Sequence, residues 1–528
     1  MRIGKRNLLA AICIILPVMF GCGETGSPRS TIQNNELIVK VIREKADCNL
    51  RIIATNADNG APTSDGLAFE NREKDSFNFS TDKVESGVRA IMLWAICADD
   101  RDRIVEMGNT IVGVPINTTT IELRTKRLQN TPGSNWFKMN TINDRIDPSM
   151  VQQNAILSYK KNAAIITGNN SYLLAWNGYG WTRIHNEQLS CFDLVGATFD
   201  AANISSPLIR AAIRPVLPKG ALCQGSTAQA LSFGFEKQEI SSRPGSSKFT
   251  NWSSAATSYA IDQTGYAKTL IISATSNVQS SVYQATSMSG EISAYFTYIS
   301  RKADGSSTSA ATINTIAASP TIDQASRQSP LALITERDSE QYFWRIIAAE
   351  ATAVDLVHKS LPAVNEKLDS ELIWALSVAS FRSKTTEGYW VIGRSGSKSP
   401  NLPIFTYSPA SGPTPATLVQ SEFLADPSSG TTTQLNYAKL NCRSIYSMDT
   451  DTSAQSRALV ACDHEGDEPW IFDCSSTSST KSVCKGEKLD RQGSQAGEFM
   501  ISIHGSQLSG KSRVWAIGNK GSIWLYQD

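Results

Sequence analysis

A recurring pair of short apolar strands, the second of which carries an aromatic residue, most restricts how this chain can fold. Four clear copies have their first strand at residues 164–168, 389–393, 458–462 and 514–518, and two weaker copies have it at 270–274 and 331–335. Successive copies lie roughly 60 residues apart, except that the first interval is about twice as long. We therefore expect a seventh copy near residue 221, with residues 220–223 as its first strand and 231–235 as its second.

Each copy is interpreted as one blade of a β-propeller. A further strand precedes the later copies, at residues 372–378, 444–448 and 499–504, so that each unit is a meander of three or four strands. The last copy leaves no room for a fourth strand before Asp528. Residues 135–139 resemble the fourth-strand segment 180–184 and are predicted to complete the last blade, which closes the ring and removes exposed sheet edges.

The predicted fold class is all-β, with a propeller of about seven blades over residues 133–528 and a small β-sandwich domain over residues 36–125. The sandwich is predicted from runs rich in Val, Ile and Thr at 36–42, 50–55, 76–79, 88–97, 103–107 and 119–124. Tandem β-sandwich domains are the alternative, because short strands with turn signals serve both folds.

The first 21 residues have the layout of a secretory signal peptide. Arg2, Lys5 and Arg6 precede an uncharged apolar stretch, residues 8–20, that is shorter than the ~20 residues of a membrane-spanning helix. The next residues, Gly21-Cys22, resemble the lipobox of bacterial lipoproteins. The resemblance implies cleavage before Cys22 and attachment of lipid, palmitate included, to this cysteine, and residues 22–35 then form a flexible tether. The alternative is an ordinary cleaved signal that happens to contain a cysteine.

The same resemblance bears on location and partners. Gly23 stands where some lipoproteins carry an aspartate that retains them at the inner membrane, so the outer membrane is expected, at its periplasmic face or at the cell surface. Cleavage removes three of the 50 basic residues and none of the 49 acidic ones, so no basic excess indicates nucleic-acid binding. The expected partners are the membrane, through the lipid on Cys22, and an envelope protein or glycan.

The cysteine count suits disulfide bonds in an exported protein. Of the ten cysteines, Cys13 leaves with the signal peptide and Cys22 carries the lipid, which leaves an even number. Eight cysteines allow 105 connectivities. We predict sequential pairing, because each pair then falls within one structural unit: Cys48 with Cys97, Cys191 with Cys223, Cys442 with Cys462, and Cys474 with Cys484.

One segment matches the phosphate-binding P-loop pattern letter for letter, from Gly505 to Ser512 (GSQLSGKS). A P-loop requires a helix whose N-terminus faces the phosphate, whereas residues 513–518 are strand-like. The segment is therefore interpreted as the loop of a β-hairpin, and no nucleotide is expected as a ligand.

Two acidic segments are weak candidates for calcium binding, because carboxylates at alternate positions can converge on a hard cation. The first contains Asp449 and Asp451, and the second contains Asp463, Glu465 and Asp467. Neither has the full spacing of an EF-hand loop, and ordinary solvated turns are the simpler interpretation. No metal or other cofactor is predicted.

Eleven tryptophans raise the possibility of carbohydrate binding. Those in repeat strands are predicted to fill the space between blades, namely Trp176, Trp344, Trp470, Trp515 and Trp524, whereas Trp136, Trp181 and Trp252 lie near strand edges. The functional prediction is a non-enzymatic binding or scaffold module of the bacterial envelope that acts through propeller loops, with no catalytic residue assigned. The alternative is a secreted polysaccharide hydrolase or lyase with its site in the propeller channel, which as a glycosidase would need two carboxylates about 5–9 Å apart.

Overall fold

The computed structural model describes the strands between residues 36 and 527 and part of the turns that join them. Side chains are described for residues 37–183 and 377–527, with gaps in both ranges. The described elements are β-strands, apart from one short 3-10 helix at Tyr437–Lys439. In this part of the chain, no helix is long and apolar enough to cross a membrane. The structure confirms the predicted fold class, a β-sandwich followed by a β-propeller.

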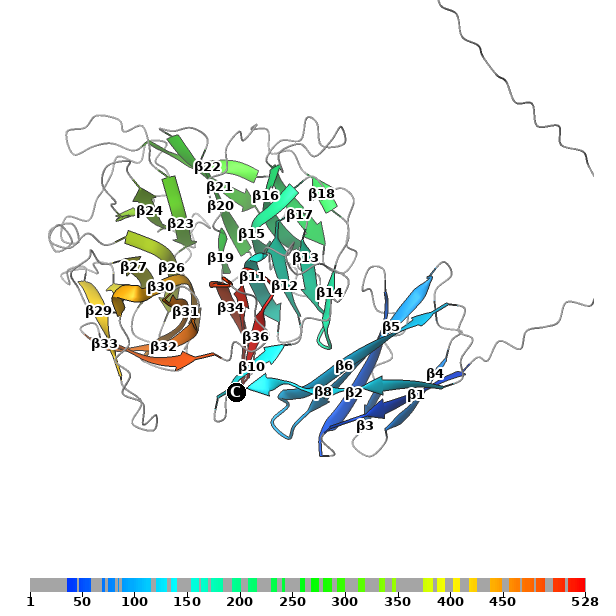
Figure 1. The fold of residues 1–528 in the computed structure, drawn as a ribbon. Coiled ribbons are helices and arrows are strands. Elements are labelled where there is room, and N and C mark those ends of the chain that lie inside the picture. The colour runs from blue at the N-terminus through cyan, green and yellow to red at the C-terminus, as the bar shows by residue number, and fades with distance from the viewer. Residues whose placement is uncertain are drawn as a thin grey trace, which may run out of the picture.

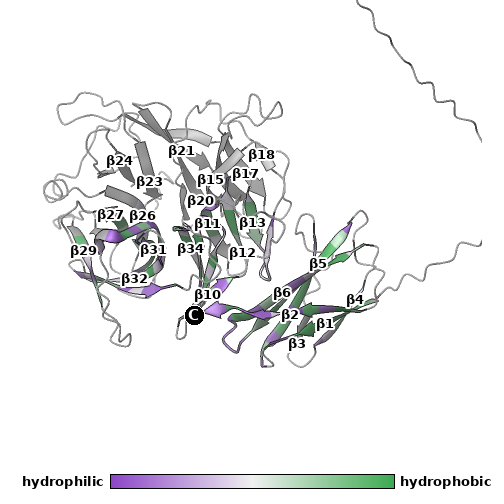
Figure 2. Ribbon diagram, in the orientation of Figure 1, coloured by the Kyte–Doolittle hydropathy of each residue, from purple (hydrophilic) through white to green (hydrophobic). Residues whose placement is uncertain are grey.

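The N-terminal module is a sandwich of two sheets (Figure 1). Alternate apolar residues of both sheets meet in one core that includes Leu37, Leu50 and Ile91, and Figure 2 shows much of these strands in the green of hydrophobic residues. A disulfide joins Cys48, which immediately precedes one strand of the second sheet, to Cys97 on the strand paired with it. One sheet has the order β4 (Ser76–Ser80), β1 (Glu36–Ile42) and β7 (Thr120–Arg124), and the other has the order β3 (Phe69–Asn71), β2 (Asn49–Asn56), β5 (Ala90–Ala98), β6 (Ile104–Gly113) and β8 (Lys126–Arg127).

The propeller consists of seven antiparallel meanders, here called blades 1 to 7 and given from the innermost strand outward. Blade 1 has β11 (Gln153–Lys160), β12 (Ala163–Gly168), β13 (Leu173–Trp176) and β14 (Trp181–Arg183); blade 2 has β15 (Phe192–Asp200), β16 (Leu208–Pro215), β17 (Gln229–Gly234) and β18 (Ile240–Ser242); blade 3 has β19 (Thr257–Ile261), β20 (Ala267–Ala274), β21 (Gln279–Thr286) and β22 (Ile292–Ile299); blade 4 has β23 (Thr312–Ala318), β24 (Ala332–Arg337) and β25 (Trp344–Ile347).

Blades 5 and 6 share one sheet, because their outermost strands β29 and β33 pair in parallel. Blade 5 has β26 (Trp374–Arg382), β27 (Glu387–Arg394), β28 (Ile404–Ser408) and β29 (Thr417–Phe423); blade 6 has β30 (Leu440–Met448), β31 (Ser456–His464), β32 (Glu468–Ser478) and β33 (Lys481–Lys488); blade 7 has β34 (Met500–Leu508), β35 (Lys511–Gly518) and β36 (Ile523–Gln527). The first strands of successive blades contact one another around the whole ring, and β34 contacts β11.

The ring is closed by a strand that precedes blade 1 in the sequence. β10 (Trp136–Met139) pairs antiparallel with β36, so that Trp136 lies opposite Tyr526 and Met139 lies opposite Ile523. A short strand, β9 (Gln129–Asn130), pairs with the other edge of β10. The prediction that residues 135–139 complete the last blade is therefore confirmed, and the outer edge of β36 is covered.

The unit predicted near residue 221 differs from the expectation. Its second strand, expected at 231–235, corresponds to β17, but the strand paired with β17 is β16, Leu208–Pro215. The prediction failed because the segment at 220–223 is apolar, whereas β16 is interrupted by Arg210 and Arg214 and so lacks the pattern of the clearer copies. Residues 220–223 themselves lie outside the described residues.

Two disulfides lie within blade 6, in the pairing predicted from the sequence. Cys442 on β30 joins Cys462 on β31, and Cys474 on β32 joins Cys484 on β33. All four cysteines are buried in the core between blades 5 and 6. The remaining predicted pair, Cys191 with Cys223, lies outside the described residues.

The sandwich is docked on the two blades that meet where the ring closes (Figure 1). Trp94 of β5 is fully buried and lies over Gly180 of blade 1, where an added methyl group would come within 2.1 Å of the indole ring. Gln527 of blade 7 both donates to and accepts from the backbone of Ile104 on β6. Ile104 also belongs to the same apolar cluster as Trp515 of blade 7, so the core continues from one module into the other.

Candidate functional site

The innermost strands of the seven blades surround the axis of the propeller, where an enzyme of this fold could place its catalytic carboxylates. Of these described strands, six contain neither Asp nor Glu, and the exception is β15, which contains Asp193 and Asp200. Seven residues of extended strand span roughly 20 Å. The innermost strands therefore do not supply two carboxylates within about 5–9 Å of each other, the separation that a glycosidase uses.

A pocket of about 310 Å³ lies between the sandwich and the propeller, and it is the candidate binding site of the described part of the chain. Its walls come from four places: the turn between β5 and β6, strand β6, the segment through β8 and β9, and the start of β10. The lining is mostly polar and includes Asp99, Arg103, Glu106, Asn130, Ser134 and Phe137. None of these residues was assigned to a site from the sequence, because they come from segments that only the folded chain brings together.

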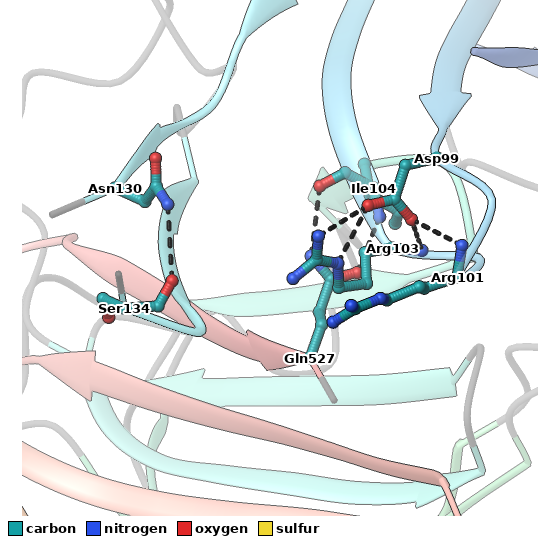
Figure 3. A network of polar contacts seen from close by, with 7 residues as sticks. All are labelled: Asp99, Arg101, Arg103, Ile104, Asn130, Ser134 and Gln527. Atoms are coloured by element: carbon teal, nitrogen blue, oxygen red, sulfur yellow. Dashed lines mark hydrogen bonds and ion pairs between the residues drawn. The ribbon is translucent and has the colours of Figure 1, made fainter. Parts of the chain in front are cut away.

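On one side of the pocket, the charged side chains of Asp99 and Arg103 form an ion pair (Figure 3). Asp99 accepts hydrogen bonds from the backbone N–H groups of Arg101 and Arg103, at 3.0 and 2.9 Å, and forms an ion pair with the guanidinium of Arg103 at 2.8 Å. Partial burial alone raises the pKa of Asp99, but the hydrogen bonds and positive charge of Arg103 outweigh it, so the pKa lies below its usual value. The carboxylate therefore fixes the turn and stays ionised.

Two further contacts fix the walls. Asn130 donates to the backbone oxygen of Ser134 at 3.3 Å, which holds the turn between β9 and β10 (Figure 3). Glu106 is fully buried, and its Oε2 accepts hydrogen bonds from the Thr125 hydroxyl at 2.7 Å and from the Glu44 N–H at 3.1 Å. The described lining of this pocket contains no His or Cys. It therefore lacks the usual combination of a nucleophile and a histidine base that activates it.

The second acidic segment proposed for calcium is used differently. Asp463 lies in strand β31 and is fully buried, not in a solvated loop. Its Oδ1 accepts the backbone N–H of Met500 at 2.8 Å, and its Oδ2 forms an ion pair with Arg443. Glu465, at the following turn, forms an ion pair with Lys439. Asp463 thus links blade 6 to the first residue of β34 in blade 7.

Other residues of the calcium proposal lie outside the described residues, namely Asp449, Asp451 and Asp467. Within the described chain, no three His, Cys, Asp or Glu side chains are grouped so that they could hold a metal ion. Alternate carboxylates in the sequence do not reveal whether a residue such as Asp463 lies in a solvated turn or at the end of a strand, where it links two blades.

Replacing Asp463 distinguishes a structural link between blades 6 and 7 from a calcium ligand. Asp463→Ala removes the acceptor of the Met500 N–H and leaves Arg443 without this partner, so we expect a loss of about 2–3 kcal/mol in the free energy of unfolding. Asp463→Asn keeps one acceptor oxygen and should lose about half as much. Denaturant titrations with calcium and with a chelator are the measurement; a midpoint that rises with calcium in the wild type and not in Asp463→Ala contradicts this role.

The segment that matches a P-loop forms a β-hairpin. Gly505 to Leu508 belong to β34, Lys511 and Ser512 belong to β35, and Leu508 lies opposite Lys511. The element that follows is therefore a strand, β35, at the place where a P-loop has a helix. Gly505 is explained by packing, since an added methyl group would come within 2.7 Å of the Tyr446 ring of blade 6.

Two of the tryptophans considered for carbohydrate binding are buried. Trp136 and Trp181 are each 3% exposed. Trp181 packs against Trp176 and Trp515 with ring centroids 5.6 and 5.0 Å apart, and Trp136 packs against Tyr526 at 5.3 Å. Both residues stand at a strand end, as predicted, because Trp136 begins β10 and Trp181 begins β14, and their side chains still fill the space between packed strands. Trp252 lies outside the described residues.

Comparisons with known proteins give fold-level likeness only. No protein-family model matches the sequence, and no curated protein matches it. Solved structures similar to it include YCF48 bound to a D1 peptide (12% identity, TM-score 0.37, 76% of this chain and 99% of that chain) and YCF48 from Cyanidioschyzon merolae (11% identity, TM-score 0.38, 74% and 98%). An ancestral GH74 enzyme is 9% identical with a TM-score of 0.46, over 87% of this chain and 68% of that chain.

Proposed function

We propose that this chain is a lipid-anchored bacterial envelope protein that binds a partner, a protein or a glycan, through loops of its propeller and does not transform it chemically. The anchor is the lipid on Cys22 after removal of residues 1–21, and the outer membrane is the proposed location. The support for the anchor is the charged and apolar layout of the leader together with Gly21-Cys22.

The observation that carries the binding role is the composition of the innermost strands. Polysaccharide hydrolysis requires an acid and a second carboxylate on either side of the scissile bond. Asp193 and Asp200, the two acids on the innermost strands, are separated by seven residues of the same strand. A propeller without such a pair on its innermost strands still offers a rigid ring from which loops can contact a partner.

The docked sandwich also suits a binding role. Because Trp94 packs over Gly180 and Gln527 holds the backbone of Ile104, the sandwich and the ring share one core. A shared core holds the sandwich and the strands of the ring in one arrangement, so these parts need no ordering when a partner binds. The tether, residues 22–35, would then set the distance of the whole body from the membrane.

Cross-linking in intact bacterial cells, followed by mass spectrometry of the captured molecules, tests the proposal. The wild-type chain should enrich one envelope protein or glycan relative to Cys22→Ala, which cannot receive lipid. The mass of the wild-type chain should show the loss of residues 1–21. Recovery of nothing but bulk porins from the wild type contradicts a specific binding role.

The enzymatic alternative has its own test in the two acids of β15. We expect purified wild-type protein, Asp193→Asn and Asp200→Asn to be equally inactive toward a panel of envelope and extracellular polysaccharides, measured as release of reducing ends or unsaturated products. A polysaccharide-degrading activity of the wild type that falls by about 100-fold or more in either variant supports the alternative.

A further inference from the structure

The boundary between blades 7 and 1, here called the seam, is the one place in the ring where neighbouring blades are not consecutive in the sequence. Two side chains of β34 cross it and accept backbone N–H groups of β11. Ser502 accepts the N–H of Ile156 at 3.2 Å, and Nδ1 of His504 accepts the N–H of Ser158 at 3.1 Å. The seam therefore contains a backbone hydrogen bond whose acceptor is an imidazole nitrogen.

The neighbouring boundary, between blades 6 and 7, lacks such an acceptor at the same point of the repeat. There Ser444 accepts the N–H of Ile503 at 3.1 Å, in the manner of Ser502 at the seam. Two residues further along, where the seam has His504, blade 6 has Tyr446, whose ring contacts Gly505. The two boundaries thus share their serine contact and differ two residues further along, where the seam has the imidazole of His504 and the other boundary has the ring of Tyr446.

The surroundings of His504 favour the neutral imidazole. Nδ1 accepts a hydrogen bond only when it carries no proton, so the ring proton lies on Nε2. The side chain is half-buried, and burial is the largest effect on its pKa, which it lowers to about 4, although backbone contacts with Ser158 and Gly505 act to raise it.

Among the residues that the structure describes, no charged side chain is a cause of the shift in the pKa of His504. Among the described side chains of the elements packed against it, β30 presents the phenol of Tyr446, with its ring centroid 5.2 Å away. β35 presents Trp515 directly opposite, and its nearest charged residue is Arg513, which interacts with Asp102 and Arg51 of the sandwich. The titration of His504 therefore depends on its burial and its backbone contacts.

We propose that the seam is an acid-sensitive latch, in which protonation of His504 at Nδ1 ends its hydrogen bond to Ser158 and loosens blade 7 from blade 1. The proton comes from solvent, and no covalent bond changes. The serine contacts contain no group that titrates between pH 7 and 4, so the contact of Ser444 with the Ile503 N–H persists while the seam weakens.

The direction and size of the effect follow from proton linkage. In the locally opened seam the imidazole is solvated and takes up a proton at its ordinary pKa of about 6.5, whereas in the closed seam it does so at about 4. As pH falls from 6.5 to 4, the open form binds a proton that the closed form does not, so opening becomes about tenfold more favourable for each pH unit. The total change is on the order of a few hundredfold over that range.

Amide hydrogen exchange of the full chain between pH 7 and 4, corrected for the intrinsic rate at each pH, tests the latch. Protection of peptides covering residues 153–160 should fall about tenfold per pH unit below 6.5, and protection of the Ile503 amide should not follow. His504→Asn, whose side-chain oxygen can accept the same N–H, should remove the pH dependence while keeping the protection. His464→Asn, at the far end of β31, is the matched control and should behave as the wild type.

Comparing the exchange of the Ser158 and Ile503 amides in the wild type tests the latch even if His504→Asn does not fold. Equal pH dependence of the Ser158 and Ile503 amides would overturn the latch, and so would a wild-type slope that persists in His504→Asn. The binding role proposed above does not enter this measurement, since no partner is present.

Discussion

Trp515→Ala should lower the free energy of unfolding by about 3–5 kcal/mol, because it empties the centre of the closure between blades 7 and 1. Trp515 is fully buried, and its ring lies 5.0 Å from that of Trp176 and 5.0 Å from that of Trp181. Strands on both sides of the cavity are held by their own ladders, so the site cannot collapse to fill it. Denaturant titration followed by circular dichroism is the measurement.

Two variants make this result specific. Trp515→Phe keeps an aromatic ring in the cluster and should lose less than half as much. Trp470→Ala removes a tryptophan of blade 6 that is only partly buried and stacks on Phe472, so its cost should lie near 1–2 kcal/mol. A loss for Trp515→Ala no larger than that for Trp470→Ala would show that the tryptophan cluster does not hold the ring together.

Gly180→Ala should cost about 3 kcal/mol and loosen the sandwich from the propeller. The added methyl group would lie 2.1 Å from Cζ3 of Trp94, and no side chain tolerates an approach that close. The indole cannot move away easily, because its Nε1 donates to the Thr55 hydroxyl at 2.9 Å and the ring is fully buried. Limited proteolysis between the modules and the unfolding midpoint should both report the change.

Removing the Trp94 indole distinguishes a clash with Trp94 from an effect of Gly180→Ala on the backbone. Trp94→Ala alone removes the indole and is itself destabilising, but adding Gly180→Ala to it should cost less than about 0.5 kcal/mol. If Gly180→Ala costs the same with and without Trp94, the sandwich is not seated on blade 1 as described.

Much of the architecture could be predicted because strand ladders leave a local trace in the sequence. The sandwich strands expected at 36–42 and 76–79 correspond to β1 and β4, where apolar residues alternate as a half-buried sheet requires. Closure by residues 135–139 was also predictable, since Trp136 repeats the aromatic position of a fourth strand. The unit near residue 221 was misplaced because Arg210 and Arg214 interrupt the apolar pattern of β16.

The polar contacts that link the parts of the molecule could not be predicted in this way. Asp463 contacts Met500, 37 residues away, and Ile104 contacts Gln527 across 423 residues. A carboxylate that follows a strand gives the same local signal whether it faces solvent or the next blade. The pocket between the modules was missed for the same reason, since its walls come from segments that no local pattern connects.

A disulfide engineered across the closing strand tests the central claim, that residues 136–139 complete the last blade. Met139→Cys with Ile523→Cys places two cysteines at directly opposite positions of β10 and β36, within the 4.4–6.8 Å between Cα atoms that a disulfide accepts. Met139→Cys with Leu525→Cys shifts the pair by two residues and serves as the control. Non-reducing mass spectrometry should show the new bond in the first variant and not in the second. Free thiols in the first variant, or equal bonding in both, would contradict a ring closed in this register.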